Sequence, residues 1–165
     1  MGLHLPYCSG IQCRTEDDMD RYTPEKRSEV MSRIGGKDTK PELTVRRLLH
    51  RLGYRFRLHR KDLPGKPDIV LPKLRLVILV HGCFWHGCEK CNRGTRVPKT
   101  NTAFWVKKIS ENRRRDAEAQ CRLADLGWHV IVLWQCETVE TDGLQERLLR
   151  ELTRAARPKA DTSET

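Results

Sequence analysis

The chain has 165 residues, enough for one domain with a hydrophobic core and too few for two comfortable ones. Hydrophobic residues make up 38% and charged residues 33%, a balance typical of a globular protein with a well-solvated surface. No apolar run approaches the roughly 20 residues that cross a bilayer, and the N-terminus lacks the basic start and apolar centre of a secretory signal. We therefore expect a cytoplasmic protein without a membrane span, whose seven cysteines are better suited to metal ligation than to disulfides.

The charge of the chain is strongly basic. Lysine and arginine number 32 against 22 aspartates and glutamates, which gives a formal net charge of +10 at pH 7. Such an excess favours a polyanionic partner, because each phosphate that is neutralised releases condensed counterions. The same excess would also keep a protein of another function in solution, so charge points only weakly to nucleic acid.

The N-terminal part of the chain shows little pattern at first. Residues 1–20 carry no hydrophobic periodicity and are expected to form a disordered arm. The folded domain is expected over residues 21–157, and a flexible tail over residues 158–165. Within the domain, residues 24–34 are expected to form a short helix that stops at Gly35-Gly36.

A second helix is marked more clearly. Thr39 and Glu42 have the spacing of a capping box at its start, and Gly53 supplies the stop. Four apolar residues at helical spacing lie on one face: Val45, Leu48, Leu49 and Leu52.

The hydrophobic period changes after Gly53. Residues 54–58 alternate apolar and basic side chains, as in a half-buried strand. Residues 63–67 form a turn, residues 68–71 a short strand, and residues 74–80 a nearly continuous apolar strand. A continuous apolar run indicates a strand in the middle of a sheet that is covered on both faces.

The second half of the chain adds the rest of the fold. Residues 81–102 are expected to be irregular, residues 103–126 to form one long helix with an apolar and a basic face, residues 128–134 a buried strand, and residues 143–156 a C-terminal helix. These elements predict a small α/β domain, with a mixed sheet flanked by helices.

Three closely spaced cysteines predict a structural zinc site. Cys83, Cys88 and Cys91 have the spacing C-x₄-C-x₂-C, and zinc takes four soft ligands in a tetrahedron. Cys136, just after the last strand, is the best fourth ligand, although His86 could take its place. The alternative is that these are ordinary buried thiols, which is the weaker interpretation for three cysteines on a polar, glycine-rich loop. The remaining cysteines receive no ligand role: Cys8, Cys13, and Cys121, which is expected to pack on the long helix.

An acidic and a histidine residue fit hydrolysis of a phosphodiester. Such a reaction needs a hard cation held by oxygen ligands and a group that activates water. Asp68 could supply a carboxylate, the Val80 carbonyl a second ligand, and His86 the base, since imidazole titrates near neutral pH. Asp68 has an alternative interpretation, because an aspartate after proline is often only a turn residue. For Glu42, helix capping is a better explanation than catalysis.

Other aromatic and histidine residues are less informative. Phe84 and Trp85 could stack on or wedge between bases, but composition favours a place in the core. Four further histidines show no constellation and are expected to be surface or core residues: His4, His50, His59 and His129.

The motifs together resemble one family, the very short patch repair (Vsr) endonucleases, which nick DNA at T:G mismatches. The matching blocks occur in family order over some two thirds of the chain: residues 37–42, 63–68 and 81–88, then Phe104-Trp105 with Lys108, Asn112 and Asp116, and finally residues 126–128 and 134–136. The resemblance is specific because the block at residues 81–88 and its flanks agree together.

The resemblance implies a restriction-endonuclease-like fold and a break 5′ of the mismatched thymine, with Mg²⁺ as cofactor. The substrate is then double-stranded DNA in which deamination of 5-methylcytosine has produced a T:G pair. Asp68 resembles the metal-binding carboxylate, with the Val80 carbonyl as second ligand. His86 matches the general base, His81 a second catalytic histidine, and Glu42 an acid near the metal.

Further matches follow the same blocks. Asp116 matches an acid that orients His86, and Phe84 and Trp85 match wedge residues that enter the duplex beside the mismatch. Met31 matches a further intercalating residue. Lys108 and Asn112 match residues that contact the mismatch. A monomer is expected, with mismatch-repair proteins as candidate partners. The zinc ligands implied are the ones chosen above: Cys83, Cys88, Cys91 and Cys136.

Two other functions remain open. A zinc-stabilised DNA-binding module would keep the charge and the cysteines but leave Asp68, His81 and His86 without a role. A restriction-type nuclease of the same fold would use those residues on a different substrate.

Overall fold

The computed structural model describes Lys26, Glu29 and residues 36–157. The chain divides after Gly35 into two units. Of the first unit only Lys26 and Glu29 are described; both are helical, and Lys26 Nζ donates to Glu29 Oε2 at 2.9 Å. The predicted arm and tail, Met31 and most of the predicted helix over residues 24–34 lie outside the described residues.

Helix α2 (Lys40–Arg51) confirms the predicted capping box. The Thr39 side chain accepts from the Glu42 backbone, and the Glu42 carboxylate accepts from the Thr39 backbone, so two end groups of the helix are satisfied. Gly53 follows the helix with φ +82°, a conformation that suits glycine. The helix therefore begins and ends where the sequence predicts.

Four strands form one mixed sheet in the order β1-β2-β3-β4. They are β1 (Arg57–Leu58), β2 (Ile69–Leu71), β3 (Leu76–His81) and β4 (His129–Trp134). The β1–β2 and β2–β3 pairs are antiparallel, and the β3–β4 pair is parallel. Strand β3 is an inner strand with almost every side chain buried, as its apolar run predicts.

Strand β1 is shorter than the alternation of residues 54–58 predicts. Only Arg57 and Leu58 have partners, on β2, and Leu58 is exposed. Tyr54 and Phe56 still pack against the core from the segment before the strand. The alternation therefore predicts the buried side correctly for Tyr54 and Phe56 but not for Leu58.

Short helices replace part of the segment expected to be irregular. Helix α3 (Cys83–His86) and helix α4 (Asn92–Thr95) lie within residues 81–102, so that prediction is wrong in part. Each has only one turn, too short for a 3.6-residue period to be visible in sequence. Two 3₁₀ turns complete the connections, η1 (Pro72–Leu74) and η2 (Gln135–Thr138).

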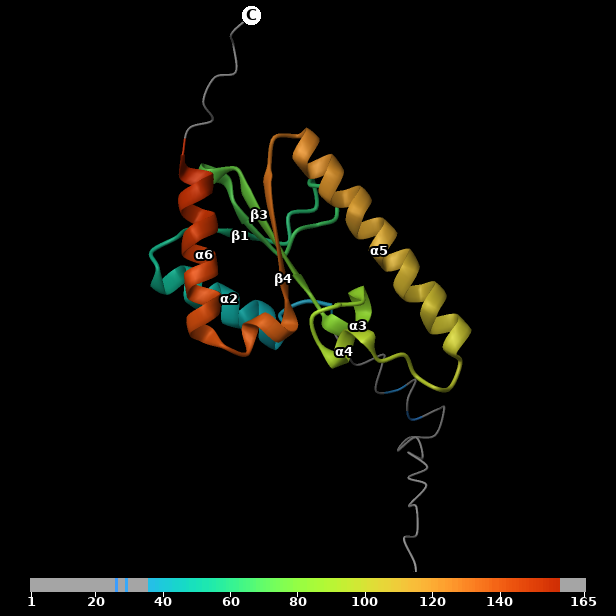
Figure 1. Ribbon diagram of the computed structural model, residues 1–165. Helices are drawn as coiled ribbons and strands as arrows, with labels where there is room; N and C mark the ends of the chain where they lie inside the picture. The colour runs from blue at the N-terminus through green and yellow to red at the C-terminus, as the bar shows by residue number, and fades with distance from the viewer. Residues whose placement is uncertain (1–25, 27–28, 30–35, 158–165) are drawn as a thin grey trace, which may run out of the picture. The chain divides into compact units, whose positions relative to one another are not determined.

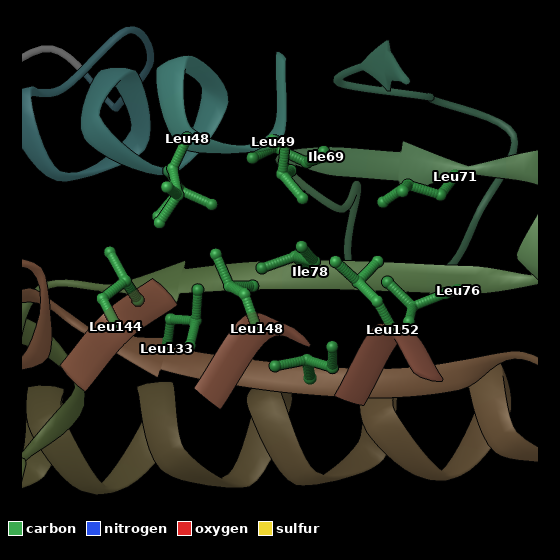
Figure 2. Close-up of a cluster of buried hydrophobic side chains, with 12 residues drawn as sticks. Leu48, Leu49, Ile69, Leu71, Leu76, Ile78, Leu133, Leu144, Leu148 and Leu152 are labelled. Carbon is green, nitrogen blue, oxygen red and sulfur yellow. The ribbon is translucent and has the colours of Figure 1, made fainter. Parts of the chain in front are cut away.

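Two long helices complete the fold, α5 (Thr102–Asp125) and α6 (Thr141–Ala156). Figure 1 shows α2 and α6 on one face of the sheet and α5 on the other. The larger core lies on the α2 and α6 face, and Figure 2 shows leucines of both helices directed at β2, β3 and β4. On the α5 face, Leu123 packs with Val70 and Val77. None of the described helices is long and apolar enough to span a membrane.

Two adjacent leucines of α6 allow the effect of core packing on stability to be distinguished from that of helix propensity. Leu148 is fully buried in the larger core, whereas Leu149 is 40% exposed. We expect Leu148→Ala to lower the free energy of unfolding by about 2–5 kcal/mol, because it leaves a cavity. Leu149→Ala should change it by less than about 0.5–1 kcal/mol. Urea denaturation of both variants measures the difference; equal losses would contradict the packing described.

Candidate active site

Asp68 lies immediately before β2 and is bonded to the backbone of β3. The Val80 N–H donates to Asp68 Oδ2 at 2.7 Å, so the two predicted metal-ligand residues are adjacent. Burial, with a smaller contribution from the negative charge of Glu42, raises the pKa of the Asp68 carboxyl to about 6, against the opposing effects of the Val80 N–H, His59 and Arg46. Asp68 is thus a half-buried carboxylate held in place by the sheet, and not a free turn residue.

Glu42 has more partners than a helix cap requires. Its Oε1 accepts from the Thr39 hydroxyl at 2.8 Å, and its Oε2 accepts from the Asp38 N–H at 3.1 Å and from Arg46 Nη2 at 2.7 Å. Its side chain is only 3% exposed. Glu42 therefore caps α2 and also places a buried negative charge near Asp68, so capping and a role in the site are compatible.

Arg46 and His59 belong to the same cluster, although neither is among the site residues predicted from the sequence. Arg46 Nη1 donates to Asp38 Oδ1 at 2.5 Å, and Arg46 Nη2 lies 3.0 Å from His59 Nε2. Because arginine only donates, His59 Nε2 accepts here. The expectation that His59 belongs to no constellation is wrong. The turn through His59, with φ +45°, brings it back to α2, and only the helical spacing from Glu42 to Arg46 was visible beforehand.

His81, His86 and Asp116 form a second group. His86 Nδ1 lies 2.5 Å from Asp116 Oδ2, and the two imidazole rings stack with centroids 4.1 Å apart. Since a carboxylate accepts, Nδ1 of His86 donates to it, and Nε2 is left as the basic nitrogen of that ring. Burial and the neighbouring His86 lower the pKa of His81 to about 4, with Asp116 opposing, so His81 is neutral at pH 7.

The carboxylate of this group is held ionised. Burial acts to raise the pKa of Asp116, but hydrogen bonding and charge from His86 outweigh it and lower the pKa below its usual value. A cavity of about 550 Å³ opens onto all three side chains between α5 and β4. Cys121 lines this cavity and is exposed, so its expected packing on the helix is wrong. It is two residues from both Ala119 and Leu123, so it does not share their buried stripe of α5.

Four aromatic rings form a cluster between α3 and the start of α5. Phe84 lies 5.2 Å from Trp105, and Trp85 lies 5.9 Å from it, in edge-to-face arrangements. Phe104 extends the cluster and is 59% exposed. Phe84 and Trp85 are only half-buried, so composition was wrong to place them in the core. The arrangement offers a partly exposed aromatic surface.

Asn112 is already occupied within the protein. Its Nδ2 donates to the Trp85 carbonyl at 2.8 Å, and its Oδ1 accepts from Arg115. Asn112 thus fixes α3 to α5 beside the aromatic cluster. Lys108, one turn earlier on the same helix, is half-buried.

The four predicted cysteines converge. Their sulfur atoms all lie within 4.8 Å of one another, with Cys88 Sγ 3.9 Å from Cys136 Sγ. The Cys136 N–H donates to Cys83 Sγ at 3.3 Å. His86 belongs to the other group, which disfavours it as the fourth ligand. The set of four thiols has the composition of a structural zinc site.

The thiols differ in ease of ionisation. Burial raises the pKa of Cys83. At Cys91 burial acts in the same direction, but hydrogen bonds from the Gly94 backbone and Cys83 lower the pKa to about 7. The loop also passes very close to itself, since a Cβ on Gly94 would lie 2.0 Å from the Cys88 carbonyl oxygen. Glycine is therefore required there, and Cys91 is the thiol of the cluster that ionises most easily.

Comparison with known proteins gives consistent similarities. Residues 19–93 match the family model described as DNA mismatch endonuclease Vsr. The chain is 53% identical over 129 residues to Type II nicking enzyme V.XorIIP of Xanthomonas oryzae pv. oryzae, covering 78% of this chain and 93% of the relative. It is 47% identical over 131 residues to Type II nicking enzyme V.NmeAIP of Neisseria meningitidis, covering 79% and 92%. It is 40% identical over 134 residues to DNA mismatch endonuclease Vsr of Escherichia coli, covering 78% and 85%.

The contribution of Arg46 to the Glu42 cluster can be tested with the neighbouring Arg47 as a control. Removing Arg46 leaves the buried Glu42 carboxylate without its charged partner, and we expect Arg46→Met to lower the free energy of unfolding by about 3–5 kcal/mol. Arg47 is exposed, and Arg47→Met should change it by less than about 0.5 kcal/mol. Urea denaturation measures both, and a stable Arg46→Met protein would show that the cluster contributes little.

Proposed function

The chain belongs to the Vsr family of DNA mismatch endonucleases, and we propose that it cuts one strand of duplex DNA 5′ of the thymine in a T:G mismatch. It is a DNA endonuclease, and its relatives include nicking enzymes. The proposed substrate arises when 5-methylcytosine deaminates to thymine opposite guanine. The observation that carries the proposal is the convergence of Asp68, Val80, His81 and the His86–Asp116 pair at one end of β3.

We propose that Asp68 and the Val80 carbonyl hold Mg²⁺. One carboxylate with a backbone carbonyl fits this ion, which keeps waters and takes phosphate oxygens as its other ligands. When bound, Mg²⁺ would stabilise the charge that develops on the phosphate. Glu42 raises the local negative charge and thereby favours a cation beside Asp68. Its own oxygens are used by Asp38, Thr39 and Arg46, so it acts through charge and not as a direct ligand.

His86 is the proposed general base. With Nδ1 bonded to Asp116, Nε2 can take a proton from the attacking water, and the carboxylate stabilises the imidazolium that results. His81 is neutral and lies against the face of that ring, so it can hold the ring and a water without repelling the new charge. Because of burial and stacking, His81 is the neutral histidine, and His86 is the one that takes the proton.

The aromatic cluster is the proposed reader of the mismatch. A T:G pair stacks poorly, so inserting Phe84 and Trp85 beside it costs less than at a matched step. Asn112 holds the Trp85 backbone and so fixes the direction of the wedge, and Lys108 on the same helix is the better candidate for a direct contact. Met31 remains a predicted intercalating residue.

Other features of the proposal follow from the family. The mixed sheet with helices on both faces is consistent with a restriction-endonuclease-like fold. Action on genomic DNA implies a place in the cytoplasm, at the nucleoid. The monomeric state and mismatch-repair partners stay predictions. Of the two rival functions, a DNA-binding module without catalysis would leave the His86–Asp116 pair idle, and a restriction-type nuclease would cut matched DNA.

A nicking assay tests the reaction and its specificity. With Mg²⁺, the wild-type protein should nick a T:G duplex and leave the C:G duplex of the same sequence intact. Asp68→Asn should lower the nicking rate by on the order of 100-fold or more, because the metal loses its carboxylate.

The matched control is Asp62→Asn, which alters an exposed aspartate paired with Arg60 and should nick at the wild-type rate. Equal cutting of both duplexes would favour the restriction-type function. Normal nicking by Asp68→Asn would refute the metal assignment.

We also propose that the four thiols bind one structural zinc ion. The metal would tie the loop after β3, whose residues 87–102 include few apolar side chains, to the turn after β4. Cys136→Ser should then lose zinc, measured by mass spectrometry of metals per chain, and should unfold at a lower temperature. Cys121→Ser, outside the cluster, should keep both. Full zinc content in Cys136→Ser would mean that another residue completes the site.

A further inference from the structure

A groove lies between the thiol loop and the first half of α5, outside the residues assigned to catalysis. Its volume is about 740 Å³, within the range of about 300–1,000 Å³ typical of ligand clefts. Thr95 and Val97 line it on the loop side, and Val106, Ile109, Arg113 and Arg114 line it on the helix side. Figure 1 shows α3 and α4 beside this half of α5.

The walls of the groove are apolar and partly open to solvent. Val97 is 37% exposed and Val106 is 52% exposed, although both are large apolar side chains. Val106, Ile109 and Arg113 have the helical spacing i, i+3, i+7, so they form one stripe of α5. Such a surface suits a flat apolar partner.

The rim of the groove is strongly basic. The two segments that form it, residues 87–97 and 106–114, contain seven lysines and arginines and only two glutamates. Two of the lining arginines pair with acids, Arg113 with Glu89 and Arg114 with Glu118. All four of these side chains are at least half exposed, and exposed pairs of this kind are weak, so a phosphate can replace the carboxylate.

Apolar walls below a basic rim are the chemistry of a single nucleic-acid strand. Phosphates of duplex DNA would suit the rim, but the base faces of a duplex are stacked and cannot reach the apolar walls. The groove is also next to the wedge: Val106 directly follows Trp105, and Gly87 directly follows His86. Insertion of the aromatic cluster beside a T:G pair, which stacks poorly, would unstack bases at this place.

We propose that this groove binds an unpaired DNA strand next to the opened mismatch, with bases on Val97, Val106 and Ile109 and phosphates on Arg113 and Arg114. The inference rests on the proposed mismatch function, because the wedge supplies the unpaired strand. Holding that strand away from the duplex would keep the opened state populated. A protein partner fits less well, since the excess of positive charge matches a polyanion.

Binding of DNA probes to the full-length protein tests the proposal. The probes are hexathymidylate and a T:G duplex nicked 5′ of the thymine, with and without an unpaired hexathymidylate tail at the nick. Without Mg²⁺, fluorescence anisotropy should show tighter binding of the tailed duplex. Val106→Glu should remove that gain, a weakening on the order of tenfold, because it places a negative charge beside the phosphates and removes an apolar contact. Val97→Glu, on the opposite wall, should do the same.

The matched control is Val139→Glu, a valine that is 73% exposed at the end of η2 and away from the groove. It should bind the tailed duplex as the wild type does, and all three variants should still nick an untailed T:G duplex. Equal affinity of the wild type for tailed and untailed duplexes would overturn the groove proposal while leaving mismatch nicking intact. A loss in Val139→Glu as large as in Val106→Glu would also overturn it.

Discussion

The hydrogen-bonded position of β3 is the constraint on which the rest of the structure depends. The strand pairs antiparallel with β2 and parallel with β4, and helices cover it on both faces. Its end, at Val80 and His81, is paired with β4 and lies beyond the β2 ladder, which stops at Ile78. That end carries Val80, bonded to Asp68, and His81, which faces α5. The proposed metal side and the proposed base side are therefore fixed relative to each other by backbone hydrogen bonds.

One turn of helix after β3 directs four side chains to three different clusters. Successive residues of an α-helix point about 100° apart, so the four side chains of α3 fan out around its axis. Cys83 turns to the thiols, Phe84 and Trp85 to the aromatic cluster, and His86 to Asp116. One stripe of α5, with Trp105, Asn112 and Asp116, contacts Trp85 and His86 of α3. The same stripe continues into the core through Ala119 and Leu123.

Charge balance beside Asp68 depends on residues remote in sequence. Two carboxylates, Asp68 and Glu42, are partly or fully buried near each other, and like charges in such a place oppose ionisation. Arg46 offsets this repulsion and is itself held by Asp38 and His59. Glu42, which caps α2, thus also contributes to the electrostatics of the site. A cation at Asp68 would complete the balance that Arg46 only partly provides.

Local sequence patterns were sufficient to identify the family, now confirmed, together with the limits of α2, the inner strand β3 and the four thiols, because capping, apolar runs and ligand spacing are local signals. The family blocks also supplied Asp68, His86 and Asp116 as candidates. The folded structure was needed to show that His59 and Arg46 join Glu42, that Cys136 and not His86 completes the thiols, and that the aromatics are partly exposed. Those contacts join segments far apart in the chain, and their distances depend on sheet register and helix packing, which no local pattern encodes.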